Sequence, residues 1–310
     1  MLLIFSTSLD GSAAALADRC VARGLPVFRL NTDLLGDYAI RVDASGFTLR
    51  DPTGRTATLD GITSALWRKP WIGGDDPSDA FPEPERKWVS EQLRALLREL
   101  VALCRARGAL RLVEPGADRR LNKLAQMTMA ARHLNVPAWE YTFGADPTPG
   151  TRAVKALIAE PLHHERMRFL YTSIVEAERL DARYPWLLQT PASGSHDATV
   201  VYVAGDCYGF RVRRARQDGP TDWREYINTP QADTWEPLTL PDNVAAGIRA
   251  LMADARLHYG RLDFIVDDAG HFEVLEVNSN GQFGWLDDPQ TGWLHERILD
   301  AVFDPRTTIA

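Results

Sequence analysis

The order of apolar and polar positions near the amino terminus predicts a strand, a helix and a second strand. Apolar residues fill positions 2–5 and 26–30, which predicts two strands. The helical pattern between them begins at Asp10 or Ser12, whose side chains can accept N-terminal N–H bonds, and ends at Gly24, since glycine adopts left-handed φ values. A strand–helix–strand order is typical of a βαβ unit, so we expect a parallel sheet here.

Period-two and period-3.6 patterns alternate along the rest of the chain. Residues 38–66 predict a β-meander with turns at 44–46 and 52–54. Residues 73–84 are rich in Gly, Pro and Asp and predict an exposed loop. Helical periodicity occurs at 85–107, 119–134, 242–259 and 293–303. Strand patterns occur at 153–158, 199–203 and 207–212, and a polar, turn-rich stretch occurs at 216–235.

Residues 261–278 predict a β-hairpin that could hold a divalent metal ion. With a two-residue loop at 269–270, Asp263 pairs with Glu276, and Asn278 shares their face because strand side chains alternate. Facing carboxylates repel by about 0.2–1 kcal/mol, and a cation between them would reverse the sign. Such hard oxygen ligands suit Mg²⁺. The spacing alone fits an ordinary half-exposed hairpin with acidic residues equally well.

The run that follows, Glu276 to Leu286, reads Glu-Val-Asn-Ser-Asn-Gly-Gln-Phe-Gly-Trp-Leu. It resembles the C-terminal signature of ATP-grasp enzymes, in the form found in microviridin-type (graspetide) peptide ligases. Ser279 stands where that family usually has proline. The resemblance implies that Asp263, Glu276 and Asn278 hold the Mg²⁺ ions that bridge the ATP phosphates.

The resemblance extends over nearly the whole chain. Segments similar to the family's motifs occur in the family's order at 2–10, 23–31, 66–70, 122–126, 135–137, 154–157, 170–172 and 276–286. They imply an α+β ATP-grasp fold with a βαβ-containing pre-ATP-grasp lobe at 1–115, a small central nucleotide-binding lobe at 116–190 and a C-terminal ATP-grasp lobe at 191–310. ATP would lie between the last two lobes.

Three further side chains are expected to meet the nucleotide. The resemblance implies that Lys123 and Lys155 bind ATP phosphates and that Gln189 meets the adenine edge, with Asn278 also on the cofactor side. Lys155 lies in an apolar, strand-like run, where a charged side chain needs an anion. Lys123 follows two arginines on a helix and fits a surface lysine as well, and Gln189 equally fits a polar strand end.

One family motif is incomplete. The stretch 193–199 matches Lys-x-x-Asp-x-Arg without its lysine, and Thr199 stands where the arginine is expected. In peptide-modifying members this Asp and Arg help to seat the precursor peptide or its phosphorylated form. We expect Arg213, or Arg211 after a one-residue register shift, to supply the missing catalytic charge, because a hairpin turning at 205–206 places them beside Thr199. These arginines also fit a solvated edge strand.

Composition restricts the class of protein. The 310 residues are 45% hydrophobic and 25% charged, enough for a packed core and two or three lobes. A net charge of −7 without a long basic run argues against nucleic acid as a partner. Charges interrupt every apolar run, and the first residues lack a signal peptide's basic region, so no membrane partner is expected. Three widely spaced cysteines predict free thiols in the cytoplasm.

The resemblance implies an ADP-forming ligase that uses ATP and Mg²⁺. It would activate an Asp, Glu or terminal carboxylate of a ribosomal precursor peptide (leader plus core) as an acyl phosphate, and then form an ester or amide, closing a macrocycle. Two alternatives stay open: a ligase that joins an amino acid to a peptide terminus or small molecule, and a catalytically weak homologue that binds peptide or nucleotide. The acceptor and the assembly state, a homodimer included, also stay open.

Overall fold

The amino-terminal strands form a parallel sheet in the computed structural model, which describes residues 1–70, 77–157, 162–163, 167–168, 172–214, 235–288 and 290–310. The sheet has the order β2-β1-β6-β7 and contains β1 (Leu2–Ser6), β2 (Val27–Asn31), β6 (Ser64–Trp67) and β7 (Leu110–Arg111). Helix α1 (Gly11–Ala22) connects β1 to β2. The Asp10 carboxylate accepts from the Ala13 N–H at 3.1 Å, and Gly24 has a φ of +67°, so both predicted ends are confirmed.

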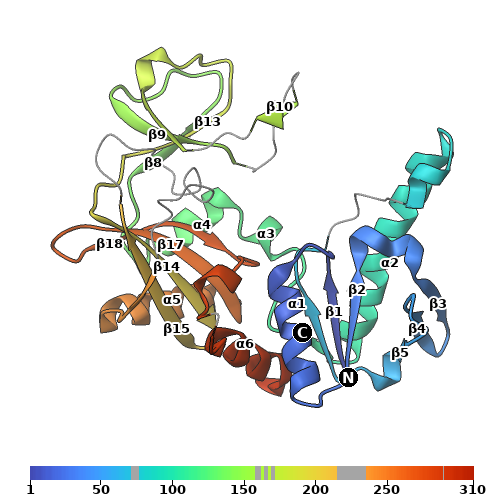
Figure 1. Ribbon diagram of the computed structural model, residues 1–310. Helices are drawn as coiled ribbons and strands as arrows, with labels where there is room; N and C mark the ends of the chain where they lie inside the picture. The colour runs from blue at the N-terminus through green and yellow to red at the C-terminus, as the bar shows by residue number, and fades with distance from the viewer. Residues whose placement is uncertain (71–76, 158–161, 164–166, 169–171, 215–234, 289) are drawn as a thin grey trace.

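A meander and a long helix complete this lobe. The meander contains β3 (Ala39–Asp43), β4 (Gly46–Arg50) and β5 (Thr56–Thr58). The last part of the predicted meander is wrong: β6 joins the parallel sheet, where its apolar run is buried on both faces. Helix α2 (Glu85–Ala106) confirms the predicted helix, but Trp88 is 63% exposed because the first turns of α2 project beyond the sheet (Figure 1).

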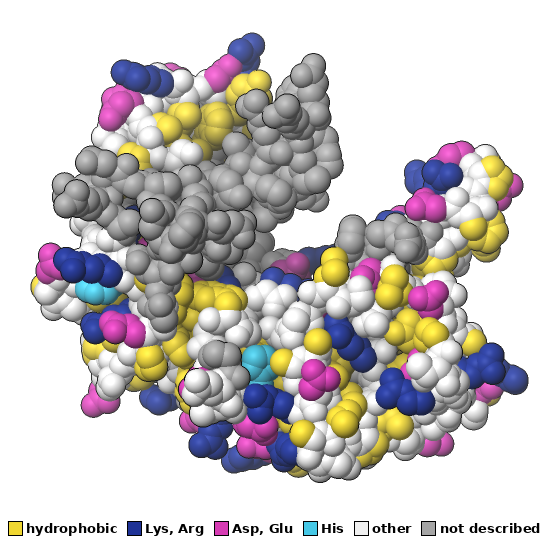
Figure 2. Space-filling model, in the orientation of Figure 1, with side chains coloured by type: hydrophobic (Ala, Val, Ile, Leu, Met, Phe, Trp, Pro, Cys, Tyr) yellow, Lys and Arg dark blue, Asp and Glu magenta, His cyan; other side chains and the backbone are white. Residues whose placement is uncertain are grey.

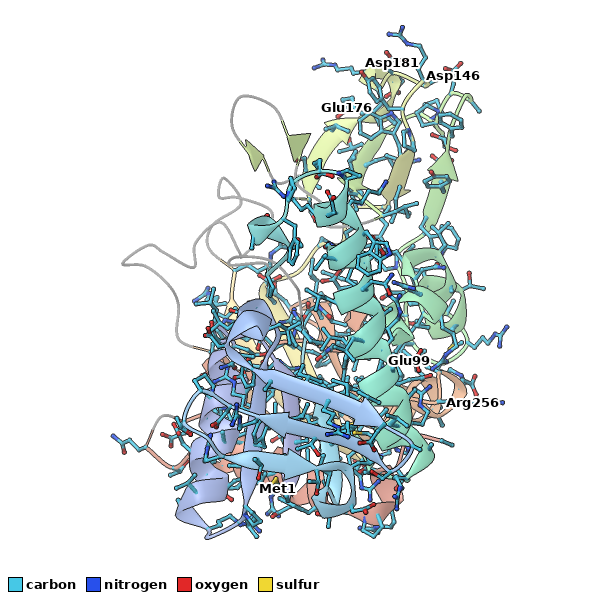
Figure 3. The ribbon with its side chains drawn as sticks, turned by 90° about the vertical axis from the view of Figure 1, so that its right-hand side faces the viewer. Met1, Glu99, Asp146, Glu176, Asp181 and Arg256 are labelled. Atoms are coloured by element: carbon cyan, nitrogen blue, oxygen red, sulfur yellow. The ribbon has the colours of Figure 1, made fainter. Side chains whose placement is uncertain are left out.

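The central sheet has the order β12-β9-β13-β8 and stands apart from the rest of the molecule (Figure 1). It contains β8 (Trp139–Thr142), β9 (Thr151–Lys155), β12 (Ser173–Glu176) and β13 (Trp186–Gln189), beside the short hairpin β10 (Leu162–His163) and β11 (Met167–Arg168). Asp146, Glu176 and Asp181 mark its far tip (Figure 3).

Two helices, α3 (Ala117–Arg120) and α4 (Lys123–Ala130), replace the single helix predicted at 119–134. The Asn122 side chain accepts from the Ala125 N–H at 3.1 Å and so starts a new helix at Lys123.

The carboxyl-terminal sheet is antiparallel, with the order β16-β15-β14-β17-β18. Its strands are β14 (His196–Val203), β15 (Asp206–Arg213), β16 (Glu236–Leu238), β17 (Tyr259–Val266) and β18 (Phe272–Asn278). Helix α5 (Asp242–Asp254) packs on the face that carries Val200, Leu262 and Val277. It ends before the predicted residue 259, because Tyr259 begins β17.

Helix α6 (Trp293–Phe303) confirms the predicted closing helix and joins the two ends of the chain. It packs on α1 and on the Val201 end of β14, in one apolar cluster with Leu2 and Ile4. It therefore covers one end of the second face of the carboxyl-terminal sheet and leaves the other end to the site described below. Figure 2 shows the projecting end of α2, with hydrophobic and charged side chains on its surface.

The predicted lobes, cysteines and loops can be compared with the structure directly. Each predicted lobe holds its own sheets, while the lobe boundaries themselves remain predictions. The three cysteines are free. None of the helices in the described part of the chain has the length and apolar composition that crossing a bilayer requires. Of the predicted loop at 73–84, Pro77–Ala80 forms a 3-10 turn, while 71–76 and the predicted loop at 216–235, up to residue 234, lie outside the described residues.

Candidate active site

The hairpin of β17 and β18 brings the predicted metal-binding residues together. Asp263 pairs with Glu276, and Arg261 pairs with Asn278, so all four side chains share one face of the sheet. The predicted two-residue loop is wrong. The Gly270 N–H donates to the Asp267 carbonyl at 3.1 Å and Gly270 has a φ of +82°, which makes a three-residue loop. A β-bulge between Asp263 and Phe264 takes up the extra residue and restores the predicted pairing.

Asp263 is held by two neighbours on this face. The Arg261 guanidinium donates from Nε to Asp263 Oδ1 at 3.1 Å and from Nη2 to Oδ2 at 2.8 Å. The Thr199 hydroxyl donates to Oδ1 at 2.8 Å, from the adjacent strand β14. We call Thr199, Arg261, Asp263, Glu276 and Asn278 the carboxylate face.

Arg261 gives this face a buried positive charge. The residue is 6% exposed, and its Nη1 donates to the Gln282 carbonyl at 3.2 Å. Burial lowers the pKa of Arg261, but the bonds with Asp263 and the field of Glu276 outweigh burial and raise the pKa above its ordinary value. Sequence analysis missed Arg261, although its place two residues before Asp263 was a signal that alternation puts both on one face.

Glu276 and Asn278 offer free oxygen ligands. Both side chains are half-buried, and neither makes a hydrogen bond or ion pair to a residue that the structure describes. With Asp263, they supply two carboxylates and an amide, a set of hard donors that fits Mg²⁺ together with phosphate oxygens. The described residues contain no cluster of three or more acidic, His or Cys ligands, so phosphates or water would have to complete such a shell.

Helix α4 connects the two predicted lysines to the carboxylate face. The Lys123 Nζ donates at 2.8 Å to the carbonyl of Ala156, the residue after Lys155. One turn further, the buried Gln126 side chain accepts from the Val277 N–H, between Glu276 and Asn278. The structure thus brings Lys123, Lys155 and the carboxylate face to the junction of the central and carboxyl-terminal sheets. Gln126 belongs to a matched motif, but its contact with Val277 was not predicted.

Gln189 and Lys155 lie on the same face of the central sheet. Lys155 pairs with Leu187, and Gln189 pairs with Ala153, so the side chains of Lys155, Ala153 and Gln189 point to one side. Gln189 is 2% exposed and its amide donates to the Met127 sulfur of α4 at 2.9 Å. The predicted nucleotide-binding residues therefore surround one junction, but their roles remain predictions.

The expected position of Arg211 and Arg213 is wrong. The hairpin turns at 204–205, where both residues have positive φ, and Thr199 pairs with Phe210. Arg211 pairs with Ala198 and Arg213 with His196, so both point away from the carboxylate face.

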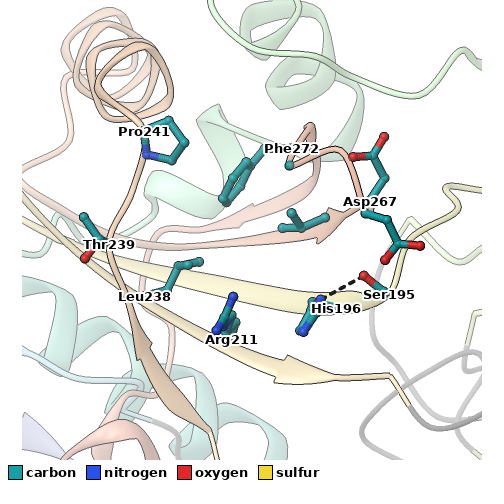
Figure 4. Close-up of a pocket in the computed structure, with 11 residues that line it drawn as sticks. Ser195, His196, Arg211, Leu238, Thr239, Pro241, Asp267 and Phe272 are labelled. Atoms are coloured by element: carbon teal, nitrogen blue, oxygen red, sulfur yellow. Dashed lines mark hydrogen bonds between the residues drawn. The ribbon is translucent and has the colours of Figure 1, made fainter.

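Arg211 instead bonds Glu236 at 2.7 Å, in a pocket of about 310 Å³ on the opposite face. Figure 4 shows this pocket, with Arg211 and His196 between Leu238 and Asp267. The position of these arginines does not support the catalytic role that we expected from the sequence.

The amino-terminal lobe reaches the site through Arg68. This residue is 1% exposed; its Nη1 donates to Asn280 Oδ1 at 2.7 Å, and its Nη2 donates to Gln282 Oε1 at 2.9 Å. Asp10 lies 3.7 Å from the same guanidinium. The Tyr259 hydroxyl donates at 2.7 Å to the Gly281 carbonyl. These contacts hold the loop after β18 against the ends of β1 and β6.

Comparisons with solved structures identify the fold. The RiPP-associated ATP-grasp ligase of Chryseobacterium gregarium, solved with ADP and a leader and core peptide, matches with a TM-score of 0.84 and 20% identity, over 97% of this chain and 96% of that one. The macrocyclase MdnC of Microcystis aeruginosa, bound to precursor peptide MdnA, matches with a TM-score of 0.78 and 20% identity, over 97% and 99%.

The ATP-grasp ligase PsnB, solved with minimal precursor, Mg and ADP, matches with a TM-score of 0.68 and 15% identity, over 97% of each chain. No protein-family model and no curated protein matches the sequence. The chain therefore has the ATP-grasp fold, which confirms the α+β fold that the sequence predicts.

Proposed function

We propose that this protein is an ADP-forming ligase that activates a side-chain or terminal carboxylate of a ribosomal precursor peptide and joins it to a hydroxyl or amine. The carboxylate face supports this proposal most strongly, because Glu276 and Asn278 lie beside Asp263 and none of the described residues occupies their side-chain oxygens. Solved structures of the same fold contain ADP, Mg and precursor peptides. A leader-plus-core peptide is thus the proposed partner, and a macrocyclic ester or amide the proposed product.

Each part of the site would have one task. Mg²⁺, held by Asp263, Glu276 and Asn278, would neutralise charge on the phosphates. Lys123 and Lys155 would bind phosphate oxygens, and Gln189 would contact the base. Catalysis of phosphoryl transfer depends mainly on positioning and electrostatics, so these residues need only hold ATP in line with the attacking carboxylate. The proposal is compatible with a monomer and with a homodimer.

We propose that Arg261 supplies the positive charge that the family's arginine would supply at position 199. Thr199 and Arg261 bond the same Asp263 oxygen, so a guanidinium attached at either position could pair with Asp263. Arg261 would act as a positioning residue that keeps Asp263 ionised and oriented towards the metal.

The two lysines give a first prediction. We expect Lys155→Ala to weaken ATP binding more than Lys123→Ala, because Lys155 lies within strand β9, where a charged side chain needs an anion. Loss of a charge-assisted hydrogen bond should cost about 1.5–3 kcal/mol, or about 10–150-fold in Kd. Titration calorimetry with ATP and Mg²⁺ measures both values, and Lys87→Ala on the exposed side of α2 is the control. Equal affinity of Lys155→Ala and the parent protein would contradict the role of Lys155.

The products of ATP give a second prediction. We expect ADP and phosphate, because a carboxylate that attacks the terminal phosphorus displaces ADP and forms an acyl phosphate, and the hydroxyl or amine then attacks the acyl carbon and displaces phosphate. Coupled assays for phosphate and for pyrophosphate, run in parallel with acidic peptides, distinguish the two cleavage sites. Pyrophosphate release would exclude the proposed reaction, and nucleotide binding without any turnover would favour a peptide- or nucleotide-binding homologue.

A further inference from the structure

The loops that follow β1 and β6 have the position of a ligand site. Strand β1 has β2 on one side and β6 on the other, so the chain reverses direction across the sheet at β1. In open parallel sheets, ligands bind at such switch points, beyond the carboxyl ends of the strands. The loops after these two strands are 7–10 and 68–70.

Both loops are held rigidly. Asp33 accepts from the Ser8 N–H at 2.7 Å and from the Ser8 hydroxyl at 2.5 Å. The Arg29 guanidinium donates to the Ser8 and Asp10 carbonyls, each at 3.2 Å. Arg68 binds the loop after β18, as described above. The two loops therefore form a fixed wall that contacts the loop leading away from Glu276 and Asn278.

Lys69 is the charged side chain that this wall presents to solvent. It is exposed, and it makes no hydrogen bond or ion pair with any residue that the structure describes. Its φ of +41° lies in the left-handed region, which costs a residue with a Cβ about 1–2 kcal/mol. Strained residues of this kind cluster at ligand sites, where the surrounding structure holds them.

Among the residues that the structure describes, no carboxylate forms an ion pair with Lys69. Desolvation by the protein, followed by the charges of Arg68 and Arg261, lowers the pKa of Lys69 to about 8. The carboxylates of Asp10 and Glu276 act in the opposite direction and raise the pKa of Lys69, but Asp10 also lies 3.7 Å from the Arg68 guanidinium, and Glu276 is a proposed metal ligand. An anionic ligand would satisfy Lys69, whereas an amine would be repelled.

We propose that Lys69 binds the side-chain carboxylate of the peptide that becomes phosphorylated, and so holds it against the carboxylate face. This inference rests on the proposed function, since it concerns the peptide carboxylate that receives the phosphoryl group of ATP. It assigns substrate selection to the amino-terminal lobe: an Asp or Glu side chain fits, and its amide analogue does not. Leu9, 88% exposed on the loop after β1, offers apolar surface to the same peptide.

The chain offers an internal set of controls, because its only lysines are Lys69, Lys87, Lys123 and Lys155. Each can be followed by mass spectrometry after brief treatment with an amine-acylating reagent. The probes are a non-hydrolysable ATP analogue with Mg²⁺, and two peptide mixtures with randomised flanks whose central residue is either Glu or Gln.

We expect nucleotide alone to protect Lys123 and Lys155, and the Glu mixture to slow acylation of Lys69 by about tenfold or more, as one charge-assisted hydrogen bond allows. The Gln mixture should leave Lys69 reactive, and Lys87 should respond to neither probe. Equal reactivity of Lys69 with both mixtures would overturn the proposed role of Lys69. Failure of nucleotide to protect Lys123 and Lys155 would instead count against the proposed function.

Turnover of the Glu mixture gives an independent measurement. We expect Lys69→Met to raise KM for peptide by about 10–100-fold while the Kd for the ATP analogue stays unchanged. Lys69→Arg should recover most of the loss, because it keeps the charge, and Lys87→Met should behave like the parent protein. A Lys69→Met protein with parental KM would also overturn the proposal.

Discussion

Glu276→Gln is expected to remove Mg²⁺-dependent turnover while the protein stays folded. The substitution removes one of two facing carboxylates on β17 and β18 and keeps the shape of the side chain. If the metal contributes about 3–4 kcal/mol of transition-state stabilisation, turnover should fall by about 10²–10³-fold. ADP release with acidic peptides, measured across a range of Mg²⁺ concentrations, gives the result.

Melting temperatures separate a lost metal ligand from a damaged fold. Without metal, Glu276→Gln should be as stable as the parent or slightly more so, because two facing carboxylates repel by about 0.2–1 kcal/mol. Mg²⁺ with an ATP analogue should raise the melting temperature of the parent but hardly that of the variant. Glu91→Gln makes the same chemical change on exposed α2, where the carboxylate pairs with Arg94, and should alter neither measurement. Full activity of Glu276→Gln would refute the metal assignment.

Arg261→Ala is expected to reduce turnover about as strongly, and also to reduce stability. It leaves Asp263 with the Thr199 hydroxyl as its remaining side-chain partner among the described residues. Removing one partner of a buried ion pair costs about 3–5 kcal/mol, and the loose carboxylate would no longer hold the metal in place. Thermal unfolding measures the first effect, and ADP release at a temperature well below the transition measures the second.

A double variant that removes the charge of Arg261 and places an arginine at position 199 tests this replacement directly. We expect Arg261→Ala combined with Thr199→Arg to recover at least about tenfold of the lost turnover, since Thr199 and Arg261 reach the same Asp263 oxygen. Arg211→Ala is the matched control, because its exposed pair with Glu236 is worth only about 0–1 kcal/mol. If the double variant stays as impaired as Arg261→Ala, Arg261 does not replace the missing arginine. A strong loss in Arg211→Ala would reinstate the cation that we first expected.

The sequence was sufficient for elements whose signals lie within a few residues of each other. Asp10 caps α1 and Gly24 ends it because capping depends on neighbouring backbone groups alone. Asp263 and Glu276 face each other because they lie on the two strands of one hairpin. The loop of this hairpin is one residue longer than predicted, but a β-bulge absorbs the extra residue, so the predicted pairing holds. Motif order was enough to predict the ATP-grasp fold.

Tertiary structure decided which distant residues share a site. Thr199 pairs with Phe210, and because strand side chains alternate, Arg211 and Arg213 lie on the other face of the sheet; the turn between β14 and β15 sets this register. The contacts of Arg68 with Asn280 and Gln282, more than 200 residues away in sequence, have no local signal. They arise because burial of α1 and α6 in one apolar cluster brings the two ends of the chain together, and burial is non-directional. Periodicity and capping therefore determined the elements, while packing between lobes placed Arg68 against the loop that follows the carboxylate face.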